Sequence, residues 1–252
     1  MRHALITAGT KGLGKKAAEQ FLQRGYSVTV SYFKDEKAAE TLKQKWGAYT
    51  DRLQVVQADV TKRGDIKHLA ASAVHKFGRL DVLVNNAGPY VFERKKLMDY
   101  TEEEWQQMIE GNLSSVFYLF QEVIPVMRKQ QYGRIVTYGF QGAGDAPAWI
   151  YRSAYAAAKS GLVSLTKTVS IEEAEYGITV NMVCPGVVTS DYKEASISEA
   201  KQVLDPDTPV GRPATGDDIA RSIAFLCEEQ SDMITGSVLE ITGGVDVLHK
   251  RR

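Results

Sequence analysis

The sequence predicts an α/β protein in which one parallel sheet of about seven strands is covered by helices on both faces. Short apolar runs alternate with longer helical patterns along the whole chain, and a glycine-rich turn follows the first run directly. Strands joined through helices are parallel, and their crossovers are right-handed. This alternation therefore predicts a doubly wound sheet in a single domain, residues 1–252, which is a chain long enough to bury one large core.

Seven apolar runs account for the strands, because strands buried on both faces are continuously hydrophobic. They are the run that begins at Ala4, then Val28–Val30, Leu53–Val56, Leu80–Val84, Arg134–Thr137, Ile178–Val183 and Ser237–Ile241. Helical periodicity fills the intervals, over Lys15–Leu22, Glu36–Trp46, Gly64–Phe77, Glu103–Lys129, Ala154–Tyr176 and Gly216–Glu228. The polar stretch at about 190–209 breaks this rhythm, so it is either a substrate lid beyond the strand ends or a surface excursion without a role.

Composition excludes several classes of protein. Lys and Arg together number 31 and so do Asp and Glu, so the chain offers no basic footprint for nucleic acid or for a membrane surface. The basic run Lys250–Arg252 is expected to be a solvated end. Two cysteines, Cys184 and Cys227, make no disulfide framework, and the four histidines form no metal-binding pattern. With no apolar run near ~20 residues and no signal peptide ahead of the first strand, we expect a cytoplasmic protein without a metal.

The first glycine-rich turn has the chemistry of an anion site. Gly9, Gly12 and Gly14 follow a strand and open a helix, in the spacing G-x-x-G-x-G. The unpaired N–H groups and the macrodipole of a helix N-terminus favour a phosphate, and a Cβ on the turn would hold it away. Taken alone, the motif is also compatible with a simple tight turn. The order strand, turn, helix favours a dinucleotide-binding unit.

Polar and small residues recur where later strands end. They are Asp59-Val60, Asn86-Ala87-Gly88, Asn112 in the helix that follows, Tyr155 with Lys159, and Pro185-Gly186. Since parallel strands place their carboxyl ends along one edge of the sheet, these residues are expected to gather at one site.

In this order the motifs resemble the short-chain dehydrogenase/reductase family, and within it the 3-oxoacyl-carrier-protein reductases most. Thr7, Gly12 and Gly14 match the family's T-G-x-x-x-G-x-G turn, whose first glycine falls on Ala8; the resemblance continues to Thr242-Gly243-Gly244. It implies a Rossmann fold and a nicotinamide cofactor. The implied cofactor-binding residues are Thr7, Gly9, Thr10, Lys11, Gly12, Leu13, Gly14, Lys34, Asp59, Val60, Asn86, Ala87, Gly88, Tyr155, Lys159, Pro185, Gly186 and Val188.

Tyr155 and Lys159 are the expected proton-transfer pair. Four residues apart, they share one helix face, and an ammonium within about 4–6 Å is expected to lower the tyrosine pKa from ~10. The pair could then donate a proton to a carbonyl oxygen or accept one in reverse. The same spacing also arises by chance on surface helices. Tyr151 is the alternative acid, but it lacks a lysine at this spacing.

Asn112 is the third catalytic residue that the resemblance implies, holding a water in a relay to Lys159. The alternative is an asparagine that caps or packs within an apolar helix, since a buried amide needs partners. Asp59 is implied to accept from the adenine amine, and its alternative is a turn aspartate.

One position departs from the family. The family places a serine just after the fifth strand, to hydrogen-bond the substrate oxygen, and this chain has Phe140 or, one residue on, Gln141. Phenylalanine cannot donate a hydrogen bond, whereas the glutamine amide can. Gln141 is favoured as a partial substitute.

The second strand ends without the acidic residue typical of NAD enzymes, since Tyr32 holds that position. Asp35 is better interpreted as an N-cap for the next helix. Lys11 and Lys34 could pair with a 2′-phosphate, unless both are surface lysines. NADP(H) is therefore the expected cofactor.

Two hypotheses of function follow. The first is an NADP(H)-dependent oxidoreductase that transfers a hydride between nicotinamide and a carbonyl or secondary alcohol, with a small-molecule or acyl thioester substrate. The second is a dinucleotide-binding protein with weak or no catalysis, a sensor or an inactive partner subunit, because the serine is missing. The resemblance also implies a homo-oligomer, a dimer or tetramer.

Overall fold

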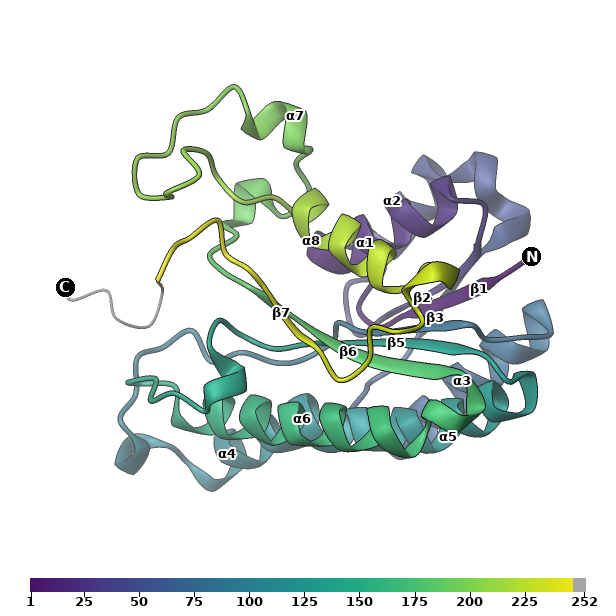
Figure 1. Ribbon diagram of the computed structural model, residues 1–252, viewed down its shortest axis with the longest axis horizontal. Coiled ribbons are helices and arrows are strands. Elements are labelled where there is room, and N and C mark those ends of the chain that lie inside the picture. Colours follow the sequence, from purple (N-terminus) through teal and green to yellow (C-terminus); the bar gives the residue numbers. More distant parts are fainter. Residues whose placement is uncertain (247–252) are drawn as a thin grey trace.

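A seven-stranded parallel sheet forms the centre of the molecule in the computed structural model, which describes residues 1–246 (Figure 1). The strand order is β3-β2-β1-β4-β5-β6-β7, so β1 and β4 are neighbours at the point where the winding reverses. This confirms the predicted doubly wound fold. The strands are β1 (His3–Ile6), β2 (Ser27–Tyr32), β3 (Leu53–Gln57), β4 (Val82–Asn85), β5 (Gly133–Tyr138), β6 (Ile178–Pro185) and β7 (Val238–Ile241).

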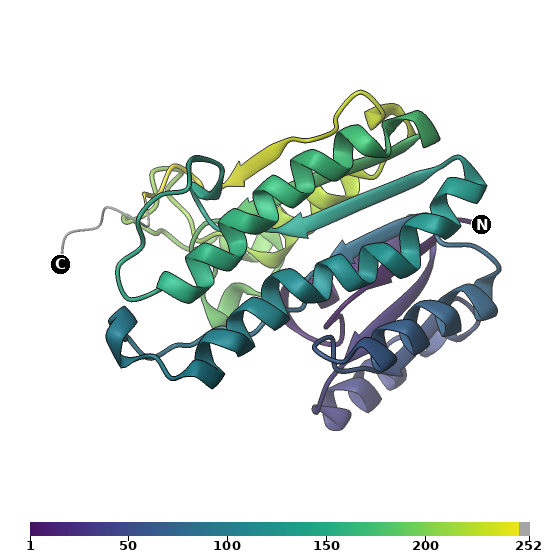
Figure 2. The same cartoon turned by 90° about the horizontal axis from the view of Figure 1, so that it is seen from below.

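Helices cover both faces of this sheet (Figure 1). On one face lie α1 (Gly12–Gln23), α2 (Glu36–Lys45) and α8 (Gly216–Leu226). On the other face, α3 (Arg63–Phe77), α5 (Ser115–Gln130) and α6 (Ser153–Glu172) run side by side along the strands, with α4 (Glu102–Ile109) ahead of α5 (Figure 2). The apolar side chains form two core layers, one for each face of the sheet.

Side chains alternate between these layers along the strands, because successive residues of a strand point to opposite faces. In β1, Ala4 and Ile6 enter the layer under α1 and α8, and Leu5 enters the layer under α3 and α5. In the first of these layers, Phe21 and Leu22 of α1 pack with Ile223 of α8. The N-terminal helix of the chain therefore shares its core with the C-terminal helix.

The long helix expected over 103–129 is interrupted. Its first part is α4, which begins at a capping box in which Thr101 and Glu104 each bond the other's backbone N–H. A π-helical turn, Glu110–Ser114, then precedes α5. A single extra residue in a turn leaves the apolar periodicity on either side nearly unchanged, so the sequence pattern did not reveal it.

Residues 190–209 extend beyond the sheet on the side of α8, at the top left of Figure 1. The segment contains the short helix α7 (Ile197–Ala200), which starts at a capping box formed by Ser196 and Glu199. Among residues 1–246, no helix is long and apolar enough to cross a membrane. The basic run Lys250–Arg252 lies outside the described residues.

Candidate active site

The glycine turn between β1 and α1 brings backbone close to backbone. A Cβ on Gly9 would lie 2.6 Å from Val30 Cγ1, and one on Gly14 would lie 2.6 Å from the Ala8 carbonyl oxygen. Gly12 instead has φ +60°, and a Cβ there would meet only Lys193, at 3.8 Å. Two glycines thus serve close packing, while Gly12 keeps the approach to the α1 N-terminus open. This cradle suits a dinucleotide pyrophosphate.

Thr7 and Asn86 tie the end of β1 to the end of β4. The Thr7 hydroxyl accepts from the backbone N–H groups of Asn86 (3.0 Å) and Ala87 (2.9 Å). The Asn86 amide donates in turn to the carbonyls of Thr7 (3.0 Å) and Ala8 (3.1 Å). The sequence-predicted residues of these two strand ends therefore meet at the switch point, where ligands bind in doubly wound folds.

A cavity of about 290 Å³ lies beside the glycine turn. Four lysines and two carboxylates are among its lining residues, and its charge therefore favours an anion. The lining residues are Thr10, Lys11, Lys15, Asp35, Lys37, Ala38, Thr41, Leu42, Lys45 and Glu194. Lys37, Thr41 and Lys45 escaped the sequence reasoning, although their spacing of four residues places them on one face of α2.

The two lysines expected at a 2′-phosphate differ in position. Lys11 lines the cavity and pairs with Asp35 across 2.7 Å. Asp35 also caps α2, as predicted, by accepting from the Ala38 N–H at 3.0 Å. Lys34 does not line the cavity; its ammonium lies 4.7 Å from the centroid of the exposed Phe33 ring. Lys34 is thus placed as a surface lysine.

The other predicted cofactor residues flank the same edge of the sheet. Asp59 Oδ1 accepts from the backbone N–H of Thr61 at 3.0 Å, the geometry of a turn aspartate. Gly186 donates its N–H to Ile241, and a Cβ there would lie 3.0 Å from Thr242 Cα. Val60 follows Asp59 in the same turn, Leu13 lies in the first turn of α1, Pro185 ends β6, and Val188 packs against the core layer under α1 and α8.

Tyr155 and Lys159 lie one turn apart on α6, as predicted. The Lys159 ammonium is 5.7 Å from the centroid of the Tyr155 ring. Tyr151 precedes the helix in a left-handed conformation, φ +66°, so it has no helical lysine partner. Of the two tyrosines, Tyr155 alone shares a helix face with Lys159.

The pKa of Tyr155 differs from the expectation. Burial raises it, with further contributions from Tyr90 and Cys184, whereas the sequence predicted that Lys159 would lower it. Burial likewise lowers the pKa of Lys159 to about 8, against a smaller opposing effect of Cys184. Desolvation disfavours the charged form of each group, and it is the largest contribution to both pKa shifts.

Three aromatic rings surround Tyr155. Tyr90 meets it edge-on with ring centroids 5.0 Å apart, and Trp149 and Phe140 lie at 6.0 and 6.2 Å. Phe140, at the position where the family has serine, is 4% exposed and packs on Trp149 at 4.9 Å. These rings shield the Tyr155 side chain from solvent. Sequence reasoning missed Tyr90 and Trp149 because both lie in loops without periodicity.

Arg152 fixes the loop that carries Tyr90. Its Nε donates to the Tyr90 hydroxyl at 2.6 Å, and its Nη atoms donate to the carbonyls of Phe92 (3.0 Å) and Glu93 (2.7 Å). Arg152 immediately precedes α6. The arginine therefore joins the loop after β4 to the helix that carries Tyr155 and Lys159.

Asn112 lies in the π-helical turn, 1% exposed, and this turn packs against α6. Its amide nitrogen donates to the carbonyls of Pro89 (2.9 Å) and Met108 (3.1 Å). Its Oδ1 is buried without a hydrogen-bond partner, and a Cβ on Gly88 would lie 2.4 Å from it. The amide thus pins the loop after β4, and the orphaned oxygen suits a water or a ligand donor.

Gln141 is directed elsewhere than expected. Its amide nitrogen donates to the carbonyl of Val245, in the segment after β7. This geometry does not favour Gln141 as the second donor to a substrate oxygen. In the described residues, no group of three or more His, Cys, Asp or Glu side chains is arranged to hold a metal ion.

The fold and the strand-end constellation define a dinucleotide-binding oxidoreductase domain, and comparison with known proteins agrees. A family model described as "Enoyl-(Acyl carrier protein) reductase" matches residues 7–246, and the chain belongs to the short-chain dehydrogenase/reductase family. It is 62% identical over 253 residues to the oxidoreductase YtkK of Bacillus subtilis, covering 100% of this chain and 99% of that one.

Two further similarities point to the same branch. The 3-oxoacyl-[acyl-carrier-protein] reductase FabG of Staphylococcus epidermidis is 35% identical over 245 residues, 97% of this chain and 98% of its own. A solved structure titled as a 3-oxoacyl-reductase from Bacillus thuringiensis superposes with a TM-score of 0.94 at 61% identity, covering 99% of this chain and all of that chain. The chain is thus a FabG-like oxidoreductase of a family that uses a nicotinamide dinucleotide.

Proposed function

We propose that this protein is an NADP(H)-dependent reductase of carbonyl compounds, with a 3-oxoacyl thioester or a similar ketone as substrate. The observation that carries the proposal is the pairing of Tyr155 with Lys159 on one face of α6, near Cys184 at the carboxyl end of β6. The similarity to FabG supports the substrate class.

The roles of the chain's own groups follow from their surroundings. When bound, the nicotinamide supplies or accepts the hydride. Tyr155 then holds the proton for the substrate oxygen at its hydroxyl, and its raised pKa keeps that proton in place until negative charge develops on the oxygen. Lys159 provides the positive charge beneath it, and the orphaned Asn112 Oδ1 supports a water that leads toward Lys159. Tyr90, Phe140 and Trp149 exclude bulk water.

The choice of NADP(H) rests on the cavity beside the glycine turn. Lys11, Lys15, Lys37 and Lys45 line it against the carboxylates of Asp35 and Glu194. A 2′-phosphate carries about two negative charges at neutral pH, and this excess of lysines would stabilise it. Tyr32, at the end of β2, offers no carboxylate to grip ribose hydroxyls.

Assembly and location are part of the proposal. Large apolar side chains are exposed on the outer helices, among them Trp105, Phe117 and Ile171, and these support a homo-oligomer. A cytoplasmic location is consistent with two free, buried cysteines.

The test is turnover of NADPH and NADH with an acetoacetyl thioester and a panel of ketones, by the wild type and two variants. We expect kcat/KM at least tenfold higher with NADPH, and we expect Tyr155→Phe to lose more than 99% of turnover while binding NADPH as before. Tyr151→Phe is the matched control and should stay within about twofold of the wild type. Dinucleotide binding without wild-type turnover would favour a binding protein instead.

A further inference from the structure

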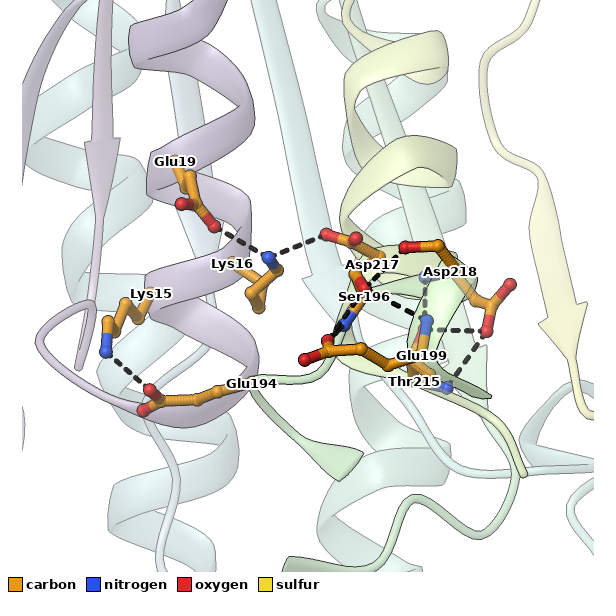
Figure 3. A network of polar contacts seen from close by, with 10 residues as sticks. Lys15, Lys16, Glu19, Glu194, Ser196, Glu199, Thr215, Asp217 and Asp218 are labelled. Atoms are coloured by element: carbon orange, nitrogen blue, oxygen red, sulfur yellow. Dashed lines mark hydrogen bonds and ion pairs between the residues drawn. The ribbon is translucent and has the colours of Figure 1, made fainter. Parts of the chain in front are cut away.

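A carboxylate from a distant part of the chain lies at the N-terminus of α1. Glu194, in the segment between β6 and α7, accepts from the Gly12 N–H through Oε1 at 2.8 Å. Its Oε2 forms an ion pair with the Lys15 ammonium (Figure 3). Both partners belong to the first turn of α1, and they are separated from Glu194 by about 180 residues of sequence.

This end of α1 needs an anion that its own sequence does not supply. The side chain of the N-cap residue, Lys11, forms no capping hydrogen bond with the helix, and the first turn of α1 contains no acidic residue. The free N–H groups and the macrodipole therefore remain available to a negative ligand. Within the described residues, Glu194 is the carboxylate that meets this need.

The backbone around Glu194 is held between two helix ends. The Lys193 carbonyl lies against Gly216, the first residue of α8, so closely that a Cβ on this glycine would come within 2.0 Å of it. On the other side, the Lys193 side chain approaches Gly12. Lys16 of α1 pairs with Asp217 of α8 at 2.9 Å, which joins the two helices next to the crossing segment (Figure 3).

The Glu194 carboxyl stays ionised at neutral pH. Burial raises its pKa, but the hydrogen bonds from Lys15 and from the Gly12 N–H lower it by more, and the net direction is downward. A carboxylate with two oxygens held by a helix N–H and a lysine has the charge and the acceptor geometry of a phosphate oxygen pair.

We propose that Glu194 is an internal competitor for the pyrophosphate of the dinucleotide, occupying the anion site of α1 when no cofactor is bound. The Gly12 N–H and the Lys15 ammonium cannot serve the carboxylate and a phosphate together, and the two anions repel each other. Cofactor binding therefore releases Glu194, frees Lys15 for the phosphate, and detaches residues 193–195 from α1. The proposal rests on dinucleotide binding alone and does not depend on the preference for NADP(H).

The test is calorimetric titration of NADPH and of NADH into the wild type and Glu194→Gln, which keeps the size of the side chain and removes its charge. We expect the variant to bind both cofactors about threefold to tenfold more tightly, the range that one partly exposed ion pair and one helix-terminus charge provide. Both cofactors share the pyrophosphate, so both should bind more tightly. Glu194 also lines the cavity proposed for the 2′-phosphate, so the gain for NADPH should be at least as large as the gain for NADH. Unequal wild-type affinities bear only on the choice of cofactor.

Asp191→Asn is the matched control. It makes the same change of charge in the same exposed segment, and within residues 1–246 Asp191 forms no hydrogen bond or ion pair with α1. We expect its affinities to stay within twofold of the wild type. Hydrogen exchange supplies a second readout: in the wild type, cofactor should accelerate exchange at residues 193–195, and in Glu194→Gln this exchange should be fast already. Unchanged or weaker cofactor binding by Glu194→Gln, or an equal gain in Asp191→Asn, would overturn the proposal.

Discussion

Phe140 places an apolar ring beside Tyr155, at a position where the family has a hydrogen-bonding serine. A serine at this position would offer a hydrogen bond to the substrate oxygen, whereas Phe140 is 4% exposed and packs on Trp149 and Tyr155. The ring is therefore part of the core and of the aromatic cluster around Tyr155. Gln141 donates its amide to the Val245 carbonyl, so the proposed mechanism assigns the substrate oxygen to Tyr155.

Phe140→Ser is expected to lower both stability and substrate affinity. Removing a buried ring leaves a cavity and costs about 3 kcal/mol of unfolding free energy. The lost wall should raise KM for ketones, while kcat rises only if the new hydroxyl reaches the substrate oxygen. Urea unfolding and steady-state kinetics measure the two effects. Gln141→Ala serves as the comparison and should leave kcat within twofold; a sharp fall in its kcat would restore Gln141 as the second donor.

At the scale of elements, the loop after β4 lies beside Tyr155 without regular structure of its own. Arg152 holds it by hydrogen bonds to Tyr90, Phe92 and Glu93, and Asn112 holds it by one to Pro89. These bonds come from the start of α6 and from the π-helical turn. The position of this loop beside Tyr155 thus depends on residues from the start of α6 and from the π-helical turn.

Arg152→Ala should lower kcat/KM for the accepted ketone about tenfold, mainly through KM, and leave the Kd of the cofactor unchanged. The reason is that Tyr90 loses the bond that holds its ring against Tyr155, while the glycine turn is untouched. Lysine cannot reproduce the planar fork, so Arg152→Lys should recover little. Arg94, which lies over the Tyr151 ring at 5.2 Å, provides the control. If Arg94→Ala reduces kcat/KM as much as Arg152→Ala does, general loosening of the loop is the cause.

The strands and most helices could be predicted from the sequence, because strands buried on both faces and amphipathic helices leave a clear periodic pattern. The glycine turn and the Tyr155–Lys159 pair could be found for a related reason, since their geometry is local. Tyr90, Trp149 and Glu194 could not, because each reaches the site from an aperiodic loop. The predicted direction of the Tyr155 pKa shift was also wrong, since burial raises this pKa and burial is a property of the folded core that the spacing of two residues does not reveal.

For the whole molecule, the burial of Lys159 lowers the free energy of unfolding. Burial lowers the pKa of Lys159 from 10.5 to about 8. Between these values the unfolded chain binds the proton and the folded protein does not, so unfolding free energy rises with pH across this window through this group. Below pH 8 the full penalty applies, on the order of 3 kcal/mol.

Lys159→Met should therefore be more stable than the wild type at pH 7, although inactive. The difference in unfolding free energy should shrink as pH rises from about 8 to 10.5. Urea unfolding of both proteins at pH 7, 8.5 and 10 measures it, and taking the difference removes the titration of Cys227, whose pKa burial raises to about 12. A gap that is constant with pH would mean that packing, and not charge, causes it.

The shared core of α1 and α8 also delays the folding of α1 during synthesis on the ribosome. During synthesis, Gly216 leaves the ribosome about 190 residues after Gln23. At ~5–20 residues per second, the apolar surface of α1 that meets Ile223 therefore waits roughly 10–40 s for its partner helix. Throughout this interval the apolar face of α1 on the nascent chain is exposed to solvent and to other proteins. Ribosome-bound chains that stop short of Gly216 should consequently be clients of holding chaperones, and full-length chains should not.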